Sequence, residues 1–504
     1  MTGARRRVAL IGARKAAGHT QESLAAELHV DRSTVIRWEA GEHAPLPYLW
    51  PRLARLLGQS PEQLRALIDD PSEVLPEARG SCVDVEVALD WLDRRAGWPP
   101  GTGRRKVISQ LGAVDDRALH ERNARRAKVG RSAVAHALSG YYRDRGVQGL
   151  EAYQARCAGR DVVTSIVARP EWLDLACPLT PAHDRLMLAS PVPDYSTEVD
   201  DVAAKHAVRR LAEAVAASVR LIDSPIYRLL SLDLRPGSLS GAVGLASFVE
   251  YALTMDLLEG ELLDALACDV TPKPGSLPQR DRYLPDSGSV LNMSGRLCAG
   301  GVVALCAIAR PSDAYRGAAD YVLLVQERSG QVLNAAGQLA VIPKGFHEPL
   351  ADYRADAHIG ATLKREMEEE LFGRSDVDST ISRHMVAAPM HPSRLSEPMR
   401  WLTGVPGALR MECTGFGLNL VSGNYEFASL IVIDDEEFWW RYGGHIEANW
   451  ESAGLRLYSS RDRELLAELI ADERWSNEGL FALIQGLRRL GDCGGQRVAL
   501  PALG

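Results

Sequence analysis

Residues 20–41 read TQESLAAELHVDRSTVIRWEAG, a stretch with the spacing of two short helices joined by a tight turn. Thr20 and Asp31 are residue types that cap the N-termini of helices, and Gly41 is the type that commonly ends one. Apolar residues recur three or four positions apart in both segments, so one side of each helix is predicted to be buried. The predicted inward side chains are Leu24, Ala25 and Leu28 in the first helix and Val35 and Trp38 in the second.

The second of these helices leaves a polar side exposed to solvent. The residues on or near that side are Arg32, Ser33, Ile36 and Arg37. A helix presented in this way fits the major groove of double-stranded DNA, where an arginine can donate two hydrogen bonds to one guanine. Duplex DNA is therefore the expected partner of this segment.

A longer segment, from about Arg5 to Ile68, resembles the lambda-repressor-like (XRE or Cro) helix-turn-helix family. The positions that match the family pattern are Arg14, Gln21, Trp38, Glu39 and Gly41, and those that depart from it are His29 and Asp31. The resemblance implies an all-α DNA-binding domain that acts as a homodimer, because one such module makes few contacts with DNA. The residues expected to read bases are Arg32, Ser33 and Arg37, and those expected to contact phosphates are Gln21 and Thr34. An amphipathic helical hairpin that binds another protein is the alternative.

The rest of the chain is long enough for about two further domains, since its full length is 504 residues. Residues 1–70 carry ten Arg and Lys against eight Asp and Glu, a net charge of +2, whereas the whole chain has a net charge of −8. Only this first segment leans toward nucleic acid. Proline and glycine in residues 71–80 predict a linker. The predicted domains are 1–70, a helix-turn-helix domain; 81–290, a mainly helical middle region; and 291–504, an α/β domain with a C-terminal helix.

The middle region has the composition and periodicity of packed helices. It is rich in Ala, Leu and Arg, and helical periodicity is clearest in residues 126–142, 202–222 and 246–267. Its aromatic residues, such as Trp91 and Trp172, have the spacing of core residues rather than of a ligand pocket. The sequence assigns this region no chemistry.

The last predicted domain combines apolar strands with an acidic helix. Residues 301–308 and 321–325 have the pattern of buried strands, and residues 358–371 that of a helix. On an α-helix, Glu366, Glu369 and Glu370 would share one side, because they lie at positions i, i+3 and i+4. Carboxylates this close repel one another unless a cation neutralises them, and Mg²⁺ prefers oxygen ligands of this kind. The alternative is a solvated acidic helix face.

The heptapeptide REMEEEL at residues 365–371 resembles the centre of the Nudix box, whose family pattern is Arg-Glu-apolar-x-Glu-Glu. The catalytic and metal-binding positions that this resemblance implies are Glu366, Glu369 and Glu370. Two positions depart from the family pattern, because Ala357 replaces its upstream glutamate and Phe372 replaces its glycine. Since binding requires fewer groups in place than hydrolysis does, we expect a Nudix-like domain that binds its ligand without cleaving it.

These segments together predict a sequence-specific transcription regulator whose C-terminal domain senses a nucleotide-like or phosphorylated effector. In organisation it resembles the large regulators of actinobacteria. No cofactor is expected for DNA binding, and Mg²⁺ is expected only if the acidic helix is functional. The eight cysteines form no Cys-x-x-Cys pair, and the apolar run 297–309 is too short to span a bilayer, so a cytoplasmic protein with reduced thiols and no membrane partner is expected.

Two other classes of function remain open from the sequence. One is a Mg²⁺-dependent Nudix-type hydrolase of a nucleoside diphosphate derivative, with the helix-turn-helix as an accessory domain. The other is a protein-interaction scaffold, in which the N-terminal helices contact a partner protein instead of a DNA groove.

Overall fold

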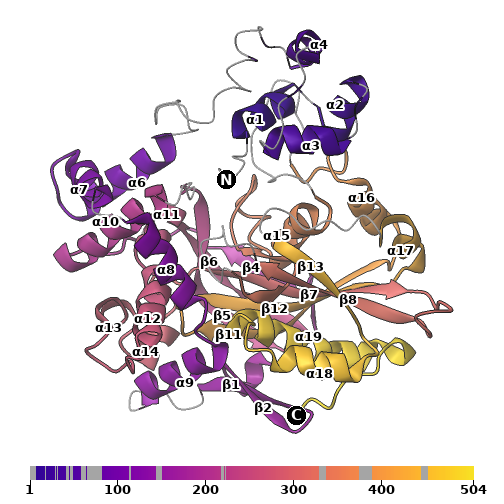
Figure 1. Cartoon of the computed structure of the whole chain (residues 1–504). Coiled ribbons are helices and arrows are strands. Elements are labelled where there is room, and N and C mark those ends of the chain that lie inside the picture. The colour runs from indigo at the N-terminus through magenta and orange to yellow at the C-terminus, as the bar shows by residue number, and fades with distance from the viewer. Residues whose placement is uncertain are drawn as a thin grey trace. The chain divides into compact units, whose positions relative to one another are not determined.

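The chain divides into two units, Met1–Val83 and Asp84–Gly504, in the computed structural model (Figure 1). The residues that the structure describes are 7–17, 19–28, 30, 32–40, 45, 49–57, 59, 64, 82–112, 115–143, 150–193, 195–216, 221, 223–328, 337–373, 389–443 and 452–504. The linker predicted at residues 71–80 and the turn and cap positions His29, Asp31 and Gly41 lie outside these residues.

The first unit is helical, as the sequence predicts. Its helices are α1 (Val8–Ala16), α2 (Gln21–Leu28), α3 (Arg32–Ala40) and α4 (Trp50–Leu56). The five side chains predicted to point inward from α2 and α3 are all buried in one hydrophobic core. Thr20 caps α2, because its Oγ1 accepts a hydrogen bond of 2.9 Å from the backbone N–H of Ser23, and Ser23 Oγ accepts the reciprocal bond from Thr20.

A ten-stranded mixed sheet forms the centre of the second unit. Its path is β1-β2-β11-β12-β7-β8-β13, and the short strands β3, β9 and β10 pair with β11, β8 and β7. The pair β7–β12 is parallel, while the other pairs of this sheet are antiparallel. The strands are β1 (Glu151–Cys157), β2 (Arg160–Ala168), β3 (Cys177–Pro178), β7 (Gly300–Arg310), β8 (Asp320–Arg328), β9 (Leu339–Val341), β10 (Lys344–Phe346), β11 (Leu409–Asn419), β12 (Tyr425–Ile433) and β13 (Ser452–Ser459).

A smaller sheet and a set of helices surround this large sheet. The small sheet has the order β4-β6-β5, with β4 (Asp184–Leu188) parallel to β6 (Ser238–Ser247) and β5 (Pro225–Arg235) antiparallel to it. The helices are α6 (Cys82–Arg95), α7 (Thr102–Leu111), α8 (Asp116–Arg126), α9 (Arg131–Tyr142), α10 (Asp201–Ala216), α11 (Phe248–Ala252), α12 (Leu257–Ala267), α13 (Pro278–Tyr283), α14 (Ser287–Leu291), α15 (Ile359–Glu366), α16 (Glu397–Gly404), α17 (Glu436–Tyr442), α18 (Arg463–Ala471) and α19 (Asn477–Cys493).

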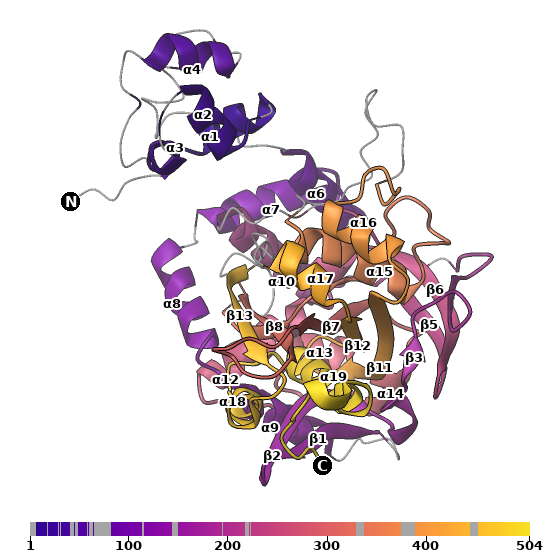
Figure 2. The same cartoon turned by 90° about the vertical axis from the view of Figure 1, so that its right-hand side faces the viewer.

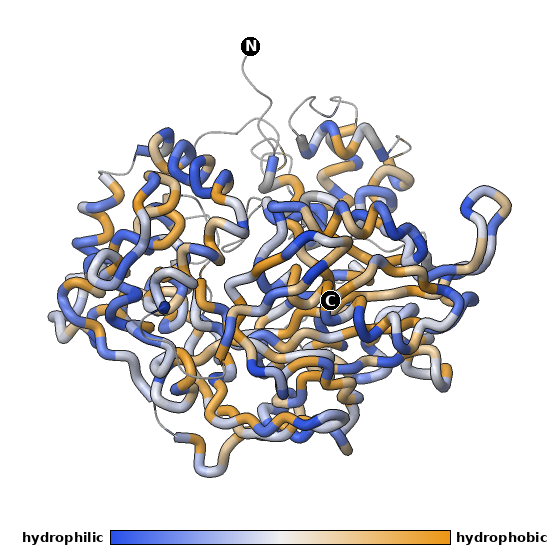
Figure 3. Tube along the Cα trace, turned by 90° about the horizontal axis from the view of Figure 1, so that it is seen from below, coloured by the Kyte–Doolittle hydropathy of each residue, from blue (hydrophilic) through white to orange (hydrophobic). Residues whose placement is uncertain are grey.

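Hydrophobic residues cover both faces of the large sheet. Alternate residues of β7 point to different cores: Val303 and Leu305 pack with α18 and α19, whereas Val302 and Ala304 belong to the core on the other face. Figures 1 and 2 show α18 and α19 together on one side of the sheet, and Figure 3 shows hydrophobic residues concentrated along the central strands. A strand buried on both faces is continuously apolar, which explains the predicted run at residues 301–308.

The predicted middle domain at 81–290 is not separate in the structure. Residues 84–504 form one unit, and the hairpin β1–β2 joins the large sheet through pairing of Ile166 and Val167 with β11. Six strands, β1 to β6, lie among its described residues, so the region is mixed instead of mainly helical. Local periodicity did not indicate this arrangement, because the pairings of β2 and β3 with β11 join segments far apart in the sequence, although β1–β2 and β5–β6 are local hairpins.

The positions of most predicted elements are confirmed, although several helices are interrupted. The predicted strands 301–308 and 321–325 lie within β7 and β8. The helix predicted at 246–267 is divided into α11 and α12, and the one at 358–371 ends as an α-helix at Glu366. No helix among the described residues is long and apolar enough to cross a membrane.

The attachment of the β1–β2 hairpin can be tested at Gly417 of β11. A Cβ at this position would lie 2.2 Å from Ile166 Cγ2 and 3.2 Å from the carbonyl oxygen of Val167. We expect Gly417→Ala to lower the free energy of unfolding by about 1 to 3 kcal/mol, measured by urea titration, because the hairpin must move away. Gly404→Ala is the control, since its Cβ would meet nothing within 4 Å. Equal effects of the two substitutions would contradict this account.

Candidate functional sites

The outer side of α3 carries the residues predicted to read DNA. Arg32 and Arg37 are exposed, and so is Ile36 between them, with 41 % of its surface accessible. Val35 and Trp38 are buried on the opposite side. Both arginines therefore lie on the exposed side of α3, because inward packing of Val35 and Trp38 determines which side of the helix faces solvent; their reading of bases stays a prediction.

The other predicted contact residues lie nearby but differ in exposure. Thr34 is half-buried on α3, and Gln21 is half-buried at the first position of α2. Ser33 belongs to α3, but its side chain is outside the described part of the structure. The roles of these residues in phosphate contact and base reading stay predictions.

A buried ion pair connects the three helices of this site. Arg14 Nε of α1 donates a hydrogen bond of 2.6 Å to Glu39 Oε1 at the end of α3, and Gln21 Nε2 of α2 donates one of 2.7 Å to Glu39 Oε2. Arg14 also donates to the carbonyl of His19 at 2.7 Å, so its charge is well satisfied. Glu39 and Arg14 are only 3 % and 6 % exposed. The network therefore fixes the orientation of α3 relative to the start of α2.

The acidic segment predicted to bind Mg²⁺ has a different geometry from a regular α-helix. Residues Met367–Leu371 form a π-helical turn directly after α15, which changes the angular spacing of the carboxylates. Glu370 Oε2 accepts a hydrogen bond of 2.6 Å from the backbone N–H of Lys344, and Glu366 Oε1 accepts one of 2.8 Å from Arg365. Burial raises the pKa of Glu366 well above its usual range, and the charges of Glu369 and Glu370 raise it further, opposed by Arg365.

These contacts do not support the predicted metal site. Within the described residues, no group of three or more His, Cys, Asp or Glu side chains is arranged to hold a metal ion. Glu366 and Glu370 are buried and already accept hydrogen bonds from the protein, while Glu369 is half-buried. The geometry favours a structural role for Glu366 and Glu370, and both metal binding and catalysis by the three glutamates stay predictions.

Two adjoining cavities in the second unit were not visible in the sequence. The larger, of about 520 Å³, has three basic side chains and no carboxylate among its lining residues: Arg185 of β4 and, before α15, Arg354 and His358. The smaller, of about 360 Å³, shares Pro181 and His358 with it. Asp184, whose carboxylate is 3.7 Å from His358 Nδ1, raises the pKa of that imidazole.

The smaller cavity is amphipathic. Its apolar lining residues include Leu179, Pro181, Leu350, Met390, Leu395 and Met399. Its three carboxylates all have partners in the protein: Asp356 Oδ2 accepts three backbone hydrogen bonds, Asp184 Oδ2 accepts one of 3.0 Å from Gly360, and Glu348 Oε1 lies 3.4 Å from Arg365 Nη1. Lys364 is exposed at this cavity. The pair of cavities therefore offers cations beside an apolar wall, which suits an anionic molecule with an organic part.

Comparisons with known proteins assign the first unit. Residues 11–64 match a protein family described as helix-turn-helix. Together with the geometry of α2 and α3, this match makes the first unit an XRE-type helix-turn-helix domain, a class of domain that reads duplex DNA. The match does not extend into the second unit.

Comparisons leave the second unit without an assignment. No curated protein matches the chain. A crystal structure of a NUDIX hydrolase from Alicyclobacillus acidocaldarius matches with 14 % identity over 38 % of this chain and 92 % of that chain, at a TM-score of 0.24. A TM-score this low carries no argument about the fold.

The buried ion pair can be tested by Glu39→Ala. Removal of this carboxylate leaves Arg14 buried without its charge partner, so we expect the free energy of unfolding of the first unit to fall by about 3 to 5 kcal/mol. Amide hydrogen exchange in α1 to α3 would measure the change, and loss of DNA binding should accompany it. Glu27→Ala, at an exposed position of α2, is the control. Unchanged exchange in Glu39→Ala would show that the pair does not hold the helices together.

Proposed function

We propose that this protein is a sequence-specific DNA-binding transcription regulator. The observation that carries the proposal is the exposure of Arg32 and Arg37 on α3, opposite the buried Val35 and Trp38. Arginine side chains on that side of a recognition helix reach guanine acceptors in the major groove. Binding as a homodimer is part of the proposal, because a single module buries too little surface for specific binding at physiological salt.

Replacement of one arginine tests base reading. We expect Arg37→Ala to weaken binding to a sequence obtained by in vitro selection by roughly 1 to 3 kcal/mol and to relax the preference at one base pair. Fluorescence anisotropy on duplexes with each base pair substituted would measure both effects. Arg55→Ala, an exposed arginine on α4, is the matched control. An equal loss of affinity for all duplexes would contradict base reading by Arg37.

We propose further that the second unit senses a nucleotide-like or phosphorylated effector in the two adjoining cavities. Arg185, Arg354 and His358 would bind the phosphate, since no carboxylate is among the described residues that line the larger cavity, although that of Asp184 lies 3.7 Å from His358. The raised pKa of His358 favours its cationic form and so strengthens this attraction. The apolar wall of the smaller cavity would accommodate the organic part of the effector. Such a molecule can change DNA binding only if it binds two arrangements of the protein with different affinity.

Thermal unfolding with small-molecule probes tests the effector site. We expect ribonucleoside 5′-diphosphates to raise the Tm of the wild-type protein more than the matching nucleosides do, because a ligand that binds the folded state stabilises it. The double variant Arg185→Ala, Arg354→Ala should lose about tenfold or more in diphosphate affinity, since charge-assisted hydrogen bonds are removed. Arg160→Ala with Arg235→Ala is the control, because both are exposed and lie outside the cavities. Equal Tm shifts by nucleoside and diphosphate would contradict the proposal.

A further inference from the structure

Positive charge is concentrated in one segment of a protein that is acidic overall. Residues 94–131 contain eleven Arg and Lys against three Asp and Glu, a net charge of +8, whereas the whole chain has a net charge of −8. The rest of the chain therefore carries −16. This segment includes Arg94 and Arg95 at the end of α6, all of α7 and α8, and the first residue of α9, Arg131. Figures 1 and 2 both show α7 and α8 along the same edge of the second unit.

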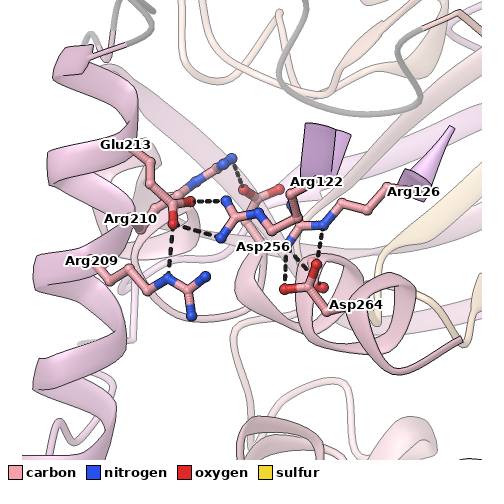
Figure 4. Close-up of polar contacts among 8 residues, drawn as sticks. Arg122, Arg126, Arg209, Arg210, Glu213, Asp256 and Asp264 are labelled. Atoms are coloured by element: carbon pink, nitrogen blue, oxygen red, sulfur yellow. Dashed lines mark hydrogen bonds and ion pairs between the residues drawn. The ribbon is translucent and has the colours of Figure 1, made fainter. Parts of the chain in front are cut away.

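Ion pairs connect α8 to α10 and α12. Arg122 donates two hydrogen bonds, of 2.8 and 2.5 Å, to the carboxylate of Glu213 on α10. Arg126, one turn later, donates two of 2.6 Å to Asp264 on α12. Figure 4 shows both pairs, with Arg209 donating to the same Glu213. Because α8 contains few apolar residues, these contacts determine which of its sides faces inward and which faces solvent.

Most of the exposed cations in residues 94–128 have no carboxylate partner among the residues that the structure describes, whereas Arg104 pairs with Glu86 and Arg117 with Glu121. Two acids of the segment are already engaged: Glu121 pairs with Arg117, and Asp115 caps α8 by accepting a hydrogen bond of 2.9 Å from the Arg117 N–H. Six exposed cations pair with no carboxylate in the described parts of the chain: Arg94, Arg95, Arg105, Lys106, Arg125 and Lys128.

We propose that this basic surface, made of the six exposed cations of α6 to α8 and the turn that follows α8, binds the phosphate backbone of duplex DNA. The proposal rests on the proposed function, because the second unit belongs to the same chain as the unit that is proposed to bind DNA. Six cations without a carboxylate partner among the described residues, on three successive helices and the turn after α8, complement the negative charge of the duplex, and each phosphate contact releases condensed counterions. The surface carries no sequence information. It adds affinity for any duplex and makes binding by the full chain more dependent on salt than the helix-turn-helix alone would make it.

The salt dependence of binding by the full-length protein tests this surface. The variant is Arg105→Gln, Lys106→Gln, Arg125→Gln, Lys128→Gln, which leaves the α8 ion pairs and the helix-turn-helix unchanged. The control removes four exposed arginines on other elements: Arg160→Gln, Arg235→Gln, Arg316→Gln, Arg400→Gln. Fluorescence anisotropy with a mixed-sequence 30-base-pair duplex, repeated over a series of salt concentrations, gives the slope of log K against log salt. Circular dichroism checks that both variants are folded.

We expect the four-residue variant to reduce the magnitude of this slope by about 3 to 4, since each lost phosphate contact contributes about 0.9. Its affinity at low salt should fall at least tenfold for every duplex, while the sequence obtained by in vitro selection stays the same. An unchanged slope, or an equal reduction in the control, would overturn the proposal. Loss of binding to RNA or to anionic vesicles with duplex binding intact would overturn it too.

Failure of the proposed function and failure of the basic-surface proposal would give different results. If the wild-type protein yields no selected sequence, or if the Arg32→Ala, Arg37→Ala variant keeps the wild-type preference, sequence reading by α3 is wrong whatever the slope does. If a preference exists and depends on these arginines but the four-residue variant has the wild-type slope, only the basic surface is wrong.

Discussion

The burial of β7 on both faces is the constraint on which the second unit depends. β7 pairs with β12, β8 and β10. Its residue Gly301 must be glycine, because a Cβ there would lie 2.2 Å from the carbonyl oxygen of Gly345 on β10. The pairing of β10 with β7 fixes the start of the segment that connects β10 to α15. Arg354 and His358, which line the larger cavity, belong to that segment. The cavities proposed for the effector are thus positioned by a strand that lines neither of them.

The two units divide the proposed work between them. The helix-turn-helix unit presents arginines from a helix whose orientation is set by a small core and the Arg14–Glu39 pair. The second unit contributes the cavities and, in the further proposal, a basic surface that recognises charge alone. Sequence specificity and sequence-independent affinity for DNA would then come from different units. An effector could therefore change the sequence-specific binding and leave the sequence-independent binding the same.

Features that depend on contacts between residues close together in the sequence could be predicted, whereas features that depend on contacts between distant segments could not. The inward residues of α2 and α3 were predictable because periodicity within 20 residues determines them. The pairing of Ile166 with Asn419 joins segments far apart in the sequence, and no local pattern indicates it. The three glutamates were assigned regular helical spacing, but the π-helical turn and the Lys344 backbone alter their surroundings. Arg185 and His358 come together only through the tertiary fold.

The most direct test of the account is recovery of genomic DNA by the full-length protein, compared with the variant Arg32→Ala, Arg37→Ala. We expect the wild-type protein to enrich fragments with a shared, paired sequence motif, and the double variant to lose the motif while retaining salt-sensitive binding to DNA. A protein that enriches no motif, or a double variant that enriches the same one, would contradict the claim that α3 reads DNA.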